Sequence, residues 1–435
     1  MNKGLLNVDE ALERLLAGAR PVAETETVPT LSATGRVLAT AQRSTMNVPP
    51  MDNSAMDGYA VRLADLKGPE PRLKVAQKIQ AGSTGKPLAP GTAARIFTGA
   101  PVPAGADAIV MQEFCTQEGE EVVVKKIPER GEWIRMTGSD IRAGGEVLPA
   151  GIRLRPQDTG LAASVGIASL PVRRRVRLGL FFTGDELVMP GEPLPPGRIY
   201  NSNRFTLNGL AGTFGCETRD YGIVPDSLAA TREVLRRAAA ECDVIVTSGG
   251  VSVGEADFVK PAVEAEGELL MWKIAMKPGR PLAFGRVGRA NFLGLPGNPV
   301  SSFVTFLVFV RPFLLKTQGV ADVQVHAIPV RADFDWPEPD PRREFLREQL
   351  RRLGPMTFAA YRRSWTYQHR TPGCDFFFLA SRLAGEHRFA LAANDQPGRN
   401  VARSSAIDAA AIDVPVAGSR CWIAVSELCH LRAVS

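Results

Sequence analysis

The sequence predicts a multidomain α/β plus β fold, in which a central, doubly wound and mostly parallel α/β domain is accompanied by β domains. The chain has 435 residues, more than one ordinary domain of about 100–200 residues can hold. Strand-like apolar runs alternate with helical stretches over 175–322, which is typical of a parallel sheet covered on both faces. Short β-like runs separated by Pro and Gly lie before and after this part, and they predict the β domains.

The first part of the chain is predicted to hold two domains. Its start, "MNKGLLNVDEALERLLAGAR", has acids and bases spaced through it and no unbroken apolar core, which favours an amphipathic helix over a signal peptide. We expect residues 1–50 and 141–174 to pack together as one discontinuous domain. Residues 51–140 contain "LKVAQKIQAG", "AARIFTG", "DAIVMQE" and "EEVVVKKI" with little helical period, so we expect a small β domain that protrudes from it.

Residues 175–322 have the clearest pattern. Strands are expected in "RVRLGLFF", "ETRDYGIV", "DVIVTSG", "ELLMWKIA" and "NFLGLPG", and helices in "DSLAATREVLRRAAAEC" and "NPVSSFVTFLVFV". The stretch "PLAFGRVGRANFLGL" is predicted to form a tight hairpin within the sheet. Ligands of such sheets bind beyond the carboxyl ends of the strands, so the glycine-rich turns that follow these strands mark the expected site.

The longest apolar run lies at the end of this domain. The run "VSSFVTFLVFVRPFLL" is interrupted by Arg311 and Pro312 and is shorter than the roughly 20 residues that span a bilayer, so we expect a buried core helix. Beyond it, the Pro-rich "WPEPDPRREF" and the short runs "CDFFFLAS", "HRFALAA" and "RCWIAVSEL" predict a β domain over 323–435.

Composition limits the classes of protein. With 45% hydrophobic and 23% charged residues, the chain resembles globular proteins that fold in water. The six cysteines form no Cys-x-x-Cys pair and the four histidines lack metal-ligand spacing, which favours a reducing cytoplasm without a structural zinc site. The net charge of +6 would suit an anionic partner. Because the arginines over 331–370 alternate with acids, we interpret them mostly as a solvated face, and nucleic acid stays a minor alternative. No membrane partner is expected.

The turn in "GLPGNPVSS" predicts the start of a helix. Pro296 and Gly297 fit the central positions of a type II turn, Asn298 is a good N-cap, and Pro299 suits the first helical position. The N–H groups and dipole of such a helix favour an anion such as phosphate or molybdate. The alternative is ordinary capping, which the motif satisfies completely.

A second turn, "SGGVSVGEAD", combines glycines with acids. Gly249 and Gly250 permit positive φ and a close approach of backbone donors to a ligand, while Glu255 and Asp257 are suited to a divalent cation that bridges phosphate oxygens. The alternative is a loop in which Asp257 caps the next helix.

Two more strand ends carry charged residues. "FFTGDELV" places Asp185 and Glu186 after a strand, and Asp226 precedes a helix that it would most simply cap. "WKIAMKPGRPLAFG" places cations around a Pro-Gly turn, where they are suited to phosphate. Taken together, the four strand ends predict a site for a phosphorylated anionic substrate and a divalent metal, with cleavage of a phosphoanhydride as a possible reaction.

A set of ordered motifs carries a resemblance to a known family. The motifs are "PPMDNSAMDGYAVR" (49–62), "IFTGAPVPAGADAIVMQE" (96–113), "GSDIRAGGEVLPAG" (138–151), "TGDELV", "TSGGVSVGEADFVK", "MKPGRPLAFG" and "GLPGNPVSSF". As a set over about residues 5–320, they closely resemble the molybdopterin molybdenumtransferase family, to which the E domain of gephyrin and a plant Cnx enzyme are related. The α/β domain of that family in turn resembles molybdopterin adenylyltransferase.

The resemblance implies an activity and a set of site residues. The family binds adenylylated molybdopterin with molybdate and a divalent cation, usually Mg²⁺, cleaves the phosphoanhydride, releases AMP and leaves molybdenum on the dithiolene. The implied catalytic residues are Asp57, Thr98, Asp140, Glu186, Asp226 and Asp257, with Glu186 and Asp257 also expected to hold the metal. The implied substrate-binding and anion-binding residues are Gly249, Gly250, Lys273, Lys277, Arg280, Pro296, Gly297, Asn298, Pro299, Ser301 and Arg343.

The resemblance also implies partners. Members of the family form homodimers in which the β domain of one subunit covers the α/β cleft of the other, and the adenylyltransferase and the acceptor molybdoenzymes are possible protein partners.

The sequence departs from the pattern of the family at two places. Arg280 stands where many relatives carry lysine, and the last domain keeps only a degenerate "QPGR" (396–399) and contains the unmatched "YRRSWTYQHRTPGCDFFF". A non-catalytic scaffold on the same fold is therefore the alternative function.

Overall fold

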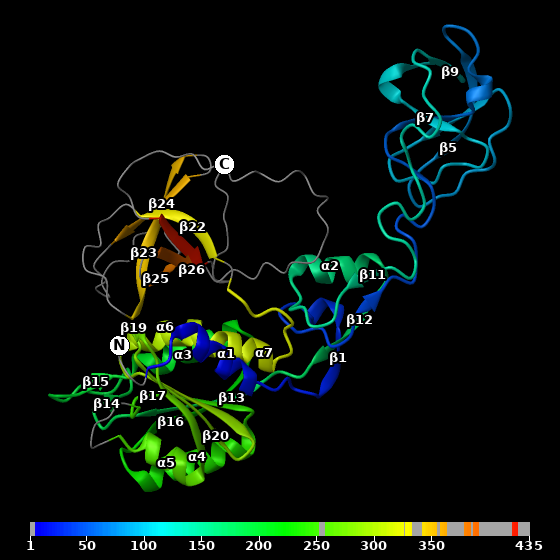
Figure 1. Cartoon of the computed structure of the whole chain (residues 1–435). Coiled ribbons are helices and arrows are strands. Elements are labelled where there is room, and N and C mark those ends of the chain that lie inside the picture. The colour runs from blue at the N-terminus through cyan, green and yellow to red at the C-terminus, as the bar shows by residue number, and fades with distance from the viewer. Residues whose placement is uncertain are drawn as a thin grey trace.

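The computed structural model describes most of the chain and shows several bodies (Figure 1). The described residues are 5–251, 257–325, 327–332, 342–354, 357–362, 378–383, 386–390 and 420–424.

The central domain is built on a six-stranded sheet. Its order is β16 (Glu217–Val224), β13 (Arg177–Thr183), β17 (Val244–Ser248), β21 (Ala290–Leu295), β20 (Pro281–Val287) and β18 (Gly267–Lys273). The first four strands are parallel, and β20 is antiparallel to both of its neighbours, so five of the six strands run in one direction. The predicted mostly parallel sheet and its β20–β21 hairpin are confirmed.

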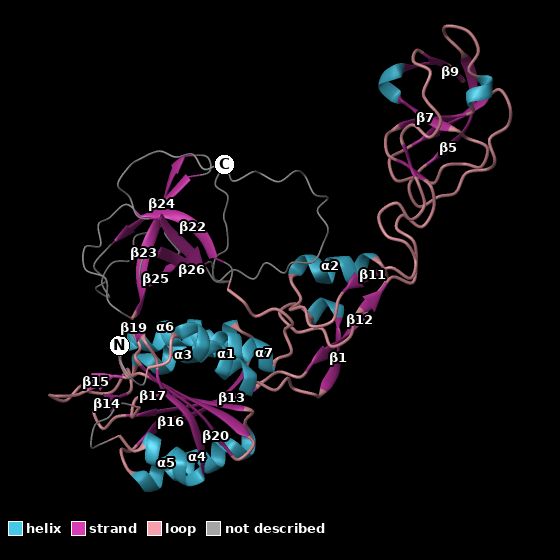
Figure 2. Cartoon of the chain, viewed as in Figure 1, coloured by secondary structure: helices cyan, strands magenta, loops and turns pink. Residues whose placement is uncertain are grey.

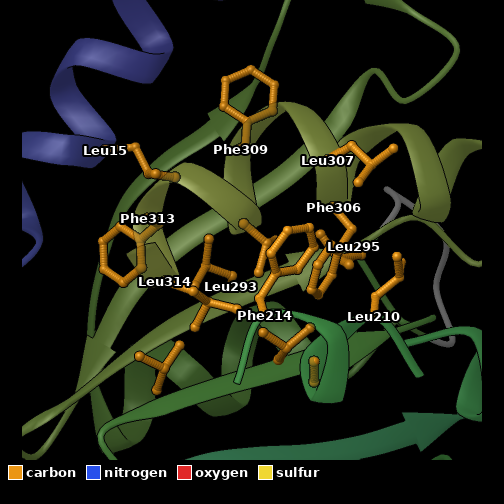
Figure 3. Close-up of a cluster of buried hydrophobic side chains, with 14 of the residues drawn as sticks. Leu15, Leu210, Phe214, Leu293, Leu295, Phe306, Leu307, Phe309, Phe313 and Leu314 are labelled. Atoms are coloured by element: carbon orange, nitrogen blue, oxygen red, sulfur yellow. The ribbon is translucent and has the colours of Figure 1, made fainter. Parts of the chain in front are cut away.

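Helices cover both faces of this sheet (Figure 2). An apolar cluster lies on each face, and alternate residues of β13 point into the two clusters. Leu180 and Phe182 pack with one cluster and Phe181 with the other. The larger cluster contains Phe306, Phe309 and Phe313 from the helical stretch 299–317 (Figure 3). Burial of each of these side chains stabilises the fold by about 1.5–3 kcal/mol. On this face lie α3 (Ser202–Thr213), α6 (Pro299–Thr305) and α7 (Arg311–Thr317), and on the other lie α4 (Leu228–Glu241) and α5 (Val259–Glu266).

The predicted core helix is confirmed as α6, a π-helical turn (Phe306–Val310) and α7. The π-helical turn ends two residues before Pro312, which has no N–H to donate and whose ring clashes with the regular helical path. Within the described residues, Pro299–Thr317 is the one helix long and apolar enough to cross a membrane, and 78% of its apolar window is buried inside the protein.

The N-terminal segments divide between two cores. Helix α1 (Val8–Gly18) is capped by Asn7 and packs Ala11 and Leu15 into the larger cluster of the α/β domain. The following segments pair with the chain after the β domain and enclose a separate small core. Their elements are β1 (Thr25–Pro29), a 3-10 turn (Thr30–Ser32), β2 (Gln42–Arg43), β11 (Glu146–Leu148), α2 (Pro156–Ser164) and β12 (Ser169–Arg173).

Residues 51–140 form an arm, which ends in the small β domain and lies apart from the α/β sheet of the same chain (Figure 1). Its six-stranded sheet has the order β7 (Ala108–Met111), β4 (Gly58–Val61), β6 (Thr92–Ile96), β5 (Arg72–Ile79), β9 (Glu121–Val124) and β8 (Cys115–Glu118). Short 3-10 turns cover Leu63–Asp65 and Gln112–Phe114, and the pair β3 (Asn53–Ser54) and β10 (Ile134–Arg135) joins the domain to its stem.

The described C-terminal residues are β strands, as predicted. One sheet has the order β19 (Met276–Lys277), β23 (Arg343–Gly354), β24 (Thr357–Arg362), β22 (Ala327–Ala332), β27 (Arg420–Ala424), β25 (Phe378–Leu383) and β26 (Glu386–Ala390). Strand β19 belongs to the α/β domain, so this sheet continues from it. The turn at 396–399 lies outside the described residues.

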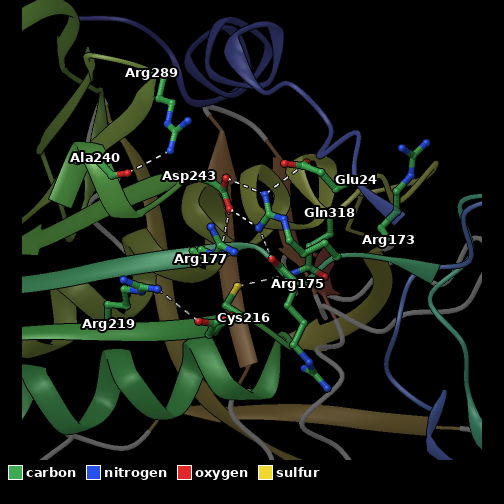
Figure 4. Close-up of polar contacts among 12 residues, drawn as sticks. Glu24, Arg173, Arg175, Arg177, Cys216, Arg219, Ala240, Asp243, Arg289 and Gln318 are labelled. Atoms are coloured by element: carbon green, nitrogen blue, oxygen red, sulfur yellow. Dashed lines mark hydrogen bonds and ion pairs between the residues drawn. The ribbon is translucent and has the colours of Figure 1, made fainter. Parts of the chain in front are cut away.

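The amino-terminal edge of the α/β sheet is closed by charge pairs (Figure 4). Asp243, just before β17, accepts hydrogen bonds from both Nη atoms of Arg174 at 3.0 and 3.1 Å and from the backbone N–H of Arg177 at 2.8 Å. Burial alone would raise the pKa of Asp243, but these bonds hold it below its ordinary value. The charged groups at this amino-terminal edge bind one another. The charged residues of the predicted site lie at the opposite, carboxyl-terminal edge.

Candidate functional site

The carboxyl ends of the parallel strands meet at one edge of the sheet. The register pairs Thr183 of β13 with Val224 of β16, and Ser248 of β17 with Leu295 of β21. The segments that follow these strands are therefore neighbours. They are 184–186, 225–226, 249–250 and 296–298. Three of them are strand ends at which the sequence predicted a site, and 225–226 carries Asp226, which the sequence most simply assigned to a helix cap.

Acids from two of these turns hold each other in place. The backbone N–H of Asp185 donates to Oδ2 of Asp226 at 3.1 Å, and that of Asp226 donates to Oδ1 of Asp185 at 3.3 Å. The capping alternative for Asp226 is wrong, because Ser227 caps α4 by accepting from the N–H of Ala230. The carboxylate of Asp226 thus remains at the edge of the sheet.

Asp226 lies among other carboxylates. Its pKa is raised, chiefly by burial and then by the negative charges of Asp185, Glu186 and Asp257, against the lowering effect of the Asp185 N–H. Phe258 occupies the N-cap position of α5 and makes no side-chain capping bond. Acids from three turns therefore influence one another electrostatically.

These oxygen ligands are of the type that Mg²⁺ prefers. Among the described residues, no three His, Cys, Asp or Glu side chains are arranged closely enough to hold a metal as they stand. Glu255 lies outside the described residues. The acids fit a divalent cation by their chemistry and mutual repulsion, and substrate oxygens would have to complete its coordination.

Gly249 and Gly250 are required by close packing. Their φ angles are 99° and 64°, as predicted. A Cβ on Gly249 would lie 2.3 Å from the carbonyl oxygen of Thr183, and one on Gly250 would lie 2.6 Å from its Oγ1. Only glycine lets the end of β17 approach the end of β13 so closely.

The turn before α6 is capped as predicted, but its type is different. Asn298 accepts from the backbone N–H of Ser301 at 3.1 Å and its Oγ at 3.3 Å, and Pro299 is the first helical residue. The type II assignment is wrong, because Gly297 is outside the left-handed region that this turn requires.

Two buried side chains that the sequence did not point to hold this turn instead. Asn203 donates from Nδ2 to the Gly297 carbonyl at 2.8 Å and to Oγ of Ser248 at 2.7 Å, and Ser248 donates to the Pro296 carbonyl at 3.0 Å. The one available signal was a polar residue on the buried face of α3.

Cations lie at the same edge, beyond β18. Lys273, Lys277 and Arg280 are all exposed. A Cβ on Gly279 would lie 2.4 Å from Oγ1 of Thr305, so the turn between the lysines and Arg280 packs against α6. This contact lies at the C-terminal end of α6, and Asn298 caps the opposite end of that helix.

The first residues of β23 reach these cations. Nζ of Lys277 lies 2.9 Å from Oε1 of Glu344, whose side chain is only 3% exposed. The Arg343 guanidinium donates to Oδ1 of Asp9 in α1 at 2.6 Å. Glu344 and Asp9 were missed, because no local pattern connects residues so distant in sequence.

The remaining predicted residues lie on the arm. Oδ1 of Asp57 accepts from the backbone N–H of Thr98 at 2.8 Å and from its Oγ1 at 2.7 Å, and these bonds lower the pKa of Asp57. Asp140 pairs with Arg135 and accepts from Ser139 Oγ at 3.2 Å. The arm carries them away from the carboxyl edge of the same chain (Figure 1), so one chain does not bring the whole predicted site together.

Comparison with known families matches both parts. Residues 6–166 match the MoeA N-terminal region, domains I and II, and residues 179–316 match a probable molybdopterin binding domain. The second match contains the carboxyl-edge residues, and the first contains the arm.

Curated relatives and a solved structure agree with these matches. A molybdopterin molybdenumtransferase of Haemophilus influenzae is 44% identical over 72% of this chain and 78% of its own length, and one of a Nostoc species is 41% identical over 68% and 70%. The crystal structure of a molybdopterin biosynthesis moeA protein from Pyrococcus horikoshii has a TM-score of 0.74 at 27% identity, covering 97% of this chain and 99% of that one.

Proposed function

This chain belongs to the molybdopterin molybdenumtransferase family, and from that premise we propose that it inserts molybdenum from molybdate into adenylylated molybdopterin, cleaving the phosphoanhydride and releasing AMP. Its family makes it a transferase of molybdenum cofactor biosynthesis. The observation that carries the finer proposal is the placing of a group of acids and of three cations along the same carboxyl edge of the sheet, within the region that matches a molybdopterin binding domain.

Cations and acids would share the work at this edge. Lys273, Lys277 and Arg280 would bind phosphate and molybdate oxygens, with the ammonium groups acting as point charges and the guanidinium as a two-pronged donor. Their positive charges also offset the negative charge that develops on the bridging oxygen as the phosphoanhydride breaks.

Glu186 and Asp257 are the residues that we propose to hold Mg²⁺. Bound there, Mg²⁺ would neutralise charge on the phosphoanhydride. Asp226 would remain beside the pair, and its bond from the N–H of Asp185 fixes its orientation. We expect AMP release to be lost in EDTA and restored by added Mg²⁺.

The position of Asp57, Thr98 and Asp140 supports a site shared between two subunits. We propose a cytoplasmic homodimer in which the arm of one subunit covers the carboxyl edge of the other. The molybdopterin adenylyltransferase that supplies the substrate and the molybdoenzymes that receive the cofactor are the proposed protein partners.

The testing experiment is AMP release from adenylylated molybdopterin with Mg²⁺, in the presence and absence of molybdate. We expect molybdate-dependent release, and we expect Asp257→Ala to lower its rate by about 100-fold. Glu264→Ala is the matched control, because this acid pairs with Lys260 on the exposed face of α5 and such a pair contributes little.

The same assay tests the scaffold alternative. Binding of adenylylated molybdopterin without AMP release, unchanged by molybdate under any divalent metal, would reject the enzymatic reaction and leave a non-catalytic scaffold.

A further inference from the structure

The segment 52–57 lies between the two loops of the arm that carry predicted catalytic residues. On one side, the N–H of Val102 donates to the Asp52 carbonyl at 2.9 Å and that of Gly99 to the Ser54 carbonyl at 2.8 Å, which ties the segment to the loop of Thr98. On the other side, β3 pairs with β10, and the N–H of Ala55 donates to the Trp133 carbonyl at 2.8 Å. This side leads directly into the loop of Asp140.

Each end of the segment has an aspartate that holds a threonine. Asp57 accepts both the N–H and the Oγ1–H of Thr98, and Asp52 accepts the same two donors of Thr137, both at 2.7 Å. The two arrangements are equivalent, although the threonines belong to different loops. The stretch "MDNSAMD" contains Met-Asp twice, and in the structure the aspartate of each pair accepts two hydrogen bonds from one threonine.

The loop held by Asp52 is the one that carries Asp140. Its backbone is tied to the chain just before Asp52, since the N–H groups of Gly138 and Asp140 donate to the carbonyls of Pro49 and Val48 at 3.0 and 2.9 Å. Trp133, at the entrance to this loop, has a φ of 59° and is the single non-glycine residue of the described chain with positive φ. Such a conformation persists where surrounding bonds enforce it, often near functional sites.

We propose that Asp52 is a positioning residue, which holds Thr137 so that Asp140 stays in a fixed relation to Asp57 and Thr98. The inference rests on the proposed function. A carboxylate that accepts two charge-assisted bonds from one residue restricts that residue more than a single bond would. Because small displacements of groups in an active site lower the rate of the chemical step, loss of this anchor should act on kcat.

The test compares Asp52→Ala with Asp52→Asn in the AMP-release assay. We expect Asp52→Ala to lower kcat about tenfold with little change in KM, and Asp52→Asn to keep most of the rate, because its amide oxygen still accepts both Thr137 donors. Asp65→Ala is the matched control. Asp65 also accepts a loop N–H, that of Gly91 at 2.9 Å, in the same β domain.

A double-mutant cycle separates positioning from general stability. If Asp52 acts through Asp140, the double variant Asp52→Ala/Asp140→Ala should be no slower than Asp140→Ala alone, within about twofold. Additive losses would overturn the proposal, as would full activity of either Asp52→Ala or Asp140→Ala.

Amide hydrogen exchange gives a readout that does not need turnover. In Asp52→Ala, the amides of 137–141 should exchange faster than in the wild type, while Asp65→Ala should leave them unchanged. If the amides of 137–141 exchange at the wild-type rate in Asp52→Ala, the proposal that Asp52 holds this loop is overturned, even when the variant is active. If the amides of 137–141 exchange faster in Asp52→Ala but the wild type releases no AMP, the tie between Asp52 and Thr137 stands and the proposed function is overturned.

Discussion

At the scale of single residues, the surroundings of Asp226 support the proposed cation site at the carboxyl edge. Burial and the nearby negative charges raise its pKa, so its charged form is less favourable in the folded chain than in the unfolded one. The folded state then binds more protons between the ordinary and the raised pKa, and stability falls as pH rises through this interval. A site that is electrostatically strained when empty is relieved by a bound cation.

We therefore predict opposite effects of Asp226→Asn on stability and on activity. At pH 7 the variant should melt at a higher temperature than the wild type, because the repulsion is removed while the amide oxygen still accepts from Asp185. Below the ordinary carboxyl pKa this difference should disappear. AMP release should fall by about tenfold or more. A lower melting temperature at neutral pH would contradict the raised pKa.

Gly250 provides a second test at this scale. Gly250→Ala should destabilise the fold by about 1–3 kcal/mol, because it combines a positive φ with a Cβ 2.6 Å from Thr183 Oγ1 and Val259 Cγ2. Gly222 has a φ of 78° but nothing within 4 Å of an added Cβ, so Gly222→Ala reports backbone strain alone. Urea unfolding of both variants should show the larger loss at Gly250, and equal losses would rule out the close contact as a cause.

At the scale of elements, β23 connects the C-terminal sheet to the predicted anion-binding turn. It pairs in parallel with β19, placing Glu344 opposite Lys277 and Arg343 opposite Met276. The Glu344 carboxylate is almost fully buried beside a half-exposed ammonium. Removing Lys277 takes a positively charged partner away from a buried charge, and such a loss costs more than an ion pair itself contributes.

We predict that Lys277→Ala lowers stability by about 1–3 kcal/mol, less than for a fully buried pair because the lysine is half exposed. Adding Glu344→Gln should recover most of this loss, since the second change removes the buried charge. Urea unfolding of the wild type, both single variants and the double variant measures the coupling. Additive losses would show that the pair is not coupled, and then loss of activity in Lys277→Ala would report anion binding alone.

At the scale of the whole molecule, the separation of the arm from the carboxyl edge supports the proposal of a site shared between two subunits. Asp57 lies on the arm and Asp257 at the edge of the sheet, and the two parts are separate within one chain (Figure 1). If the site forms between subunits, a dimer that combines one Asp57→Ala chain with one Asp257→Ala chain keeps one intact site.

We predict that mixing the two inactive variants under conditions that exchange subunits restores activity to about a quarter of the wild-type rate, because about half of the dimers are mixed and each has one intact site of two. Mixing Asp57→Ala with Asp140→Ala should restore nothing, since both residues lie on the arm. No recovery in the first mixture, with subunit exchange verified, would reject the shared site.

The features that the sequence determined by itself depend on local rules. The alternation of strands and helices, the Asn298–Pro299 helix start and the glycines after β17 follow from periodicity, capping and permitted φ angles, and the structure has all three. The placing of acids after parallel strands was also readable, because such strands end at the same edge.

Tertiary structure decided the features that depend on which distant residues meet. Ser227 rather than Asp226 caps α4, and the hydrogen bonds of Asn203 shape a turn that local preference had assigned to type II. Glu344 pairs with Lys277, and Asp52 with Thr137, across long separations in sequence. A side chain takes the partner that satisfies its charge and hydrogen bonds in the packed molecule, and local sequence does not contain that partner.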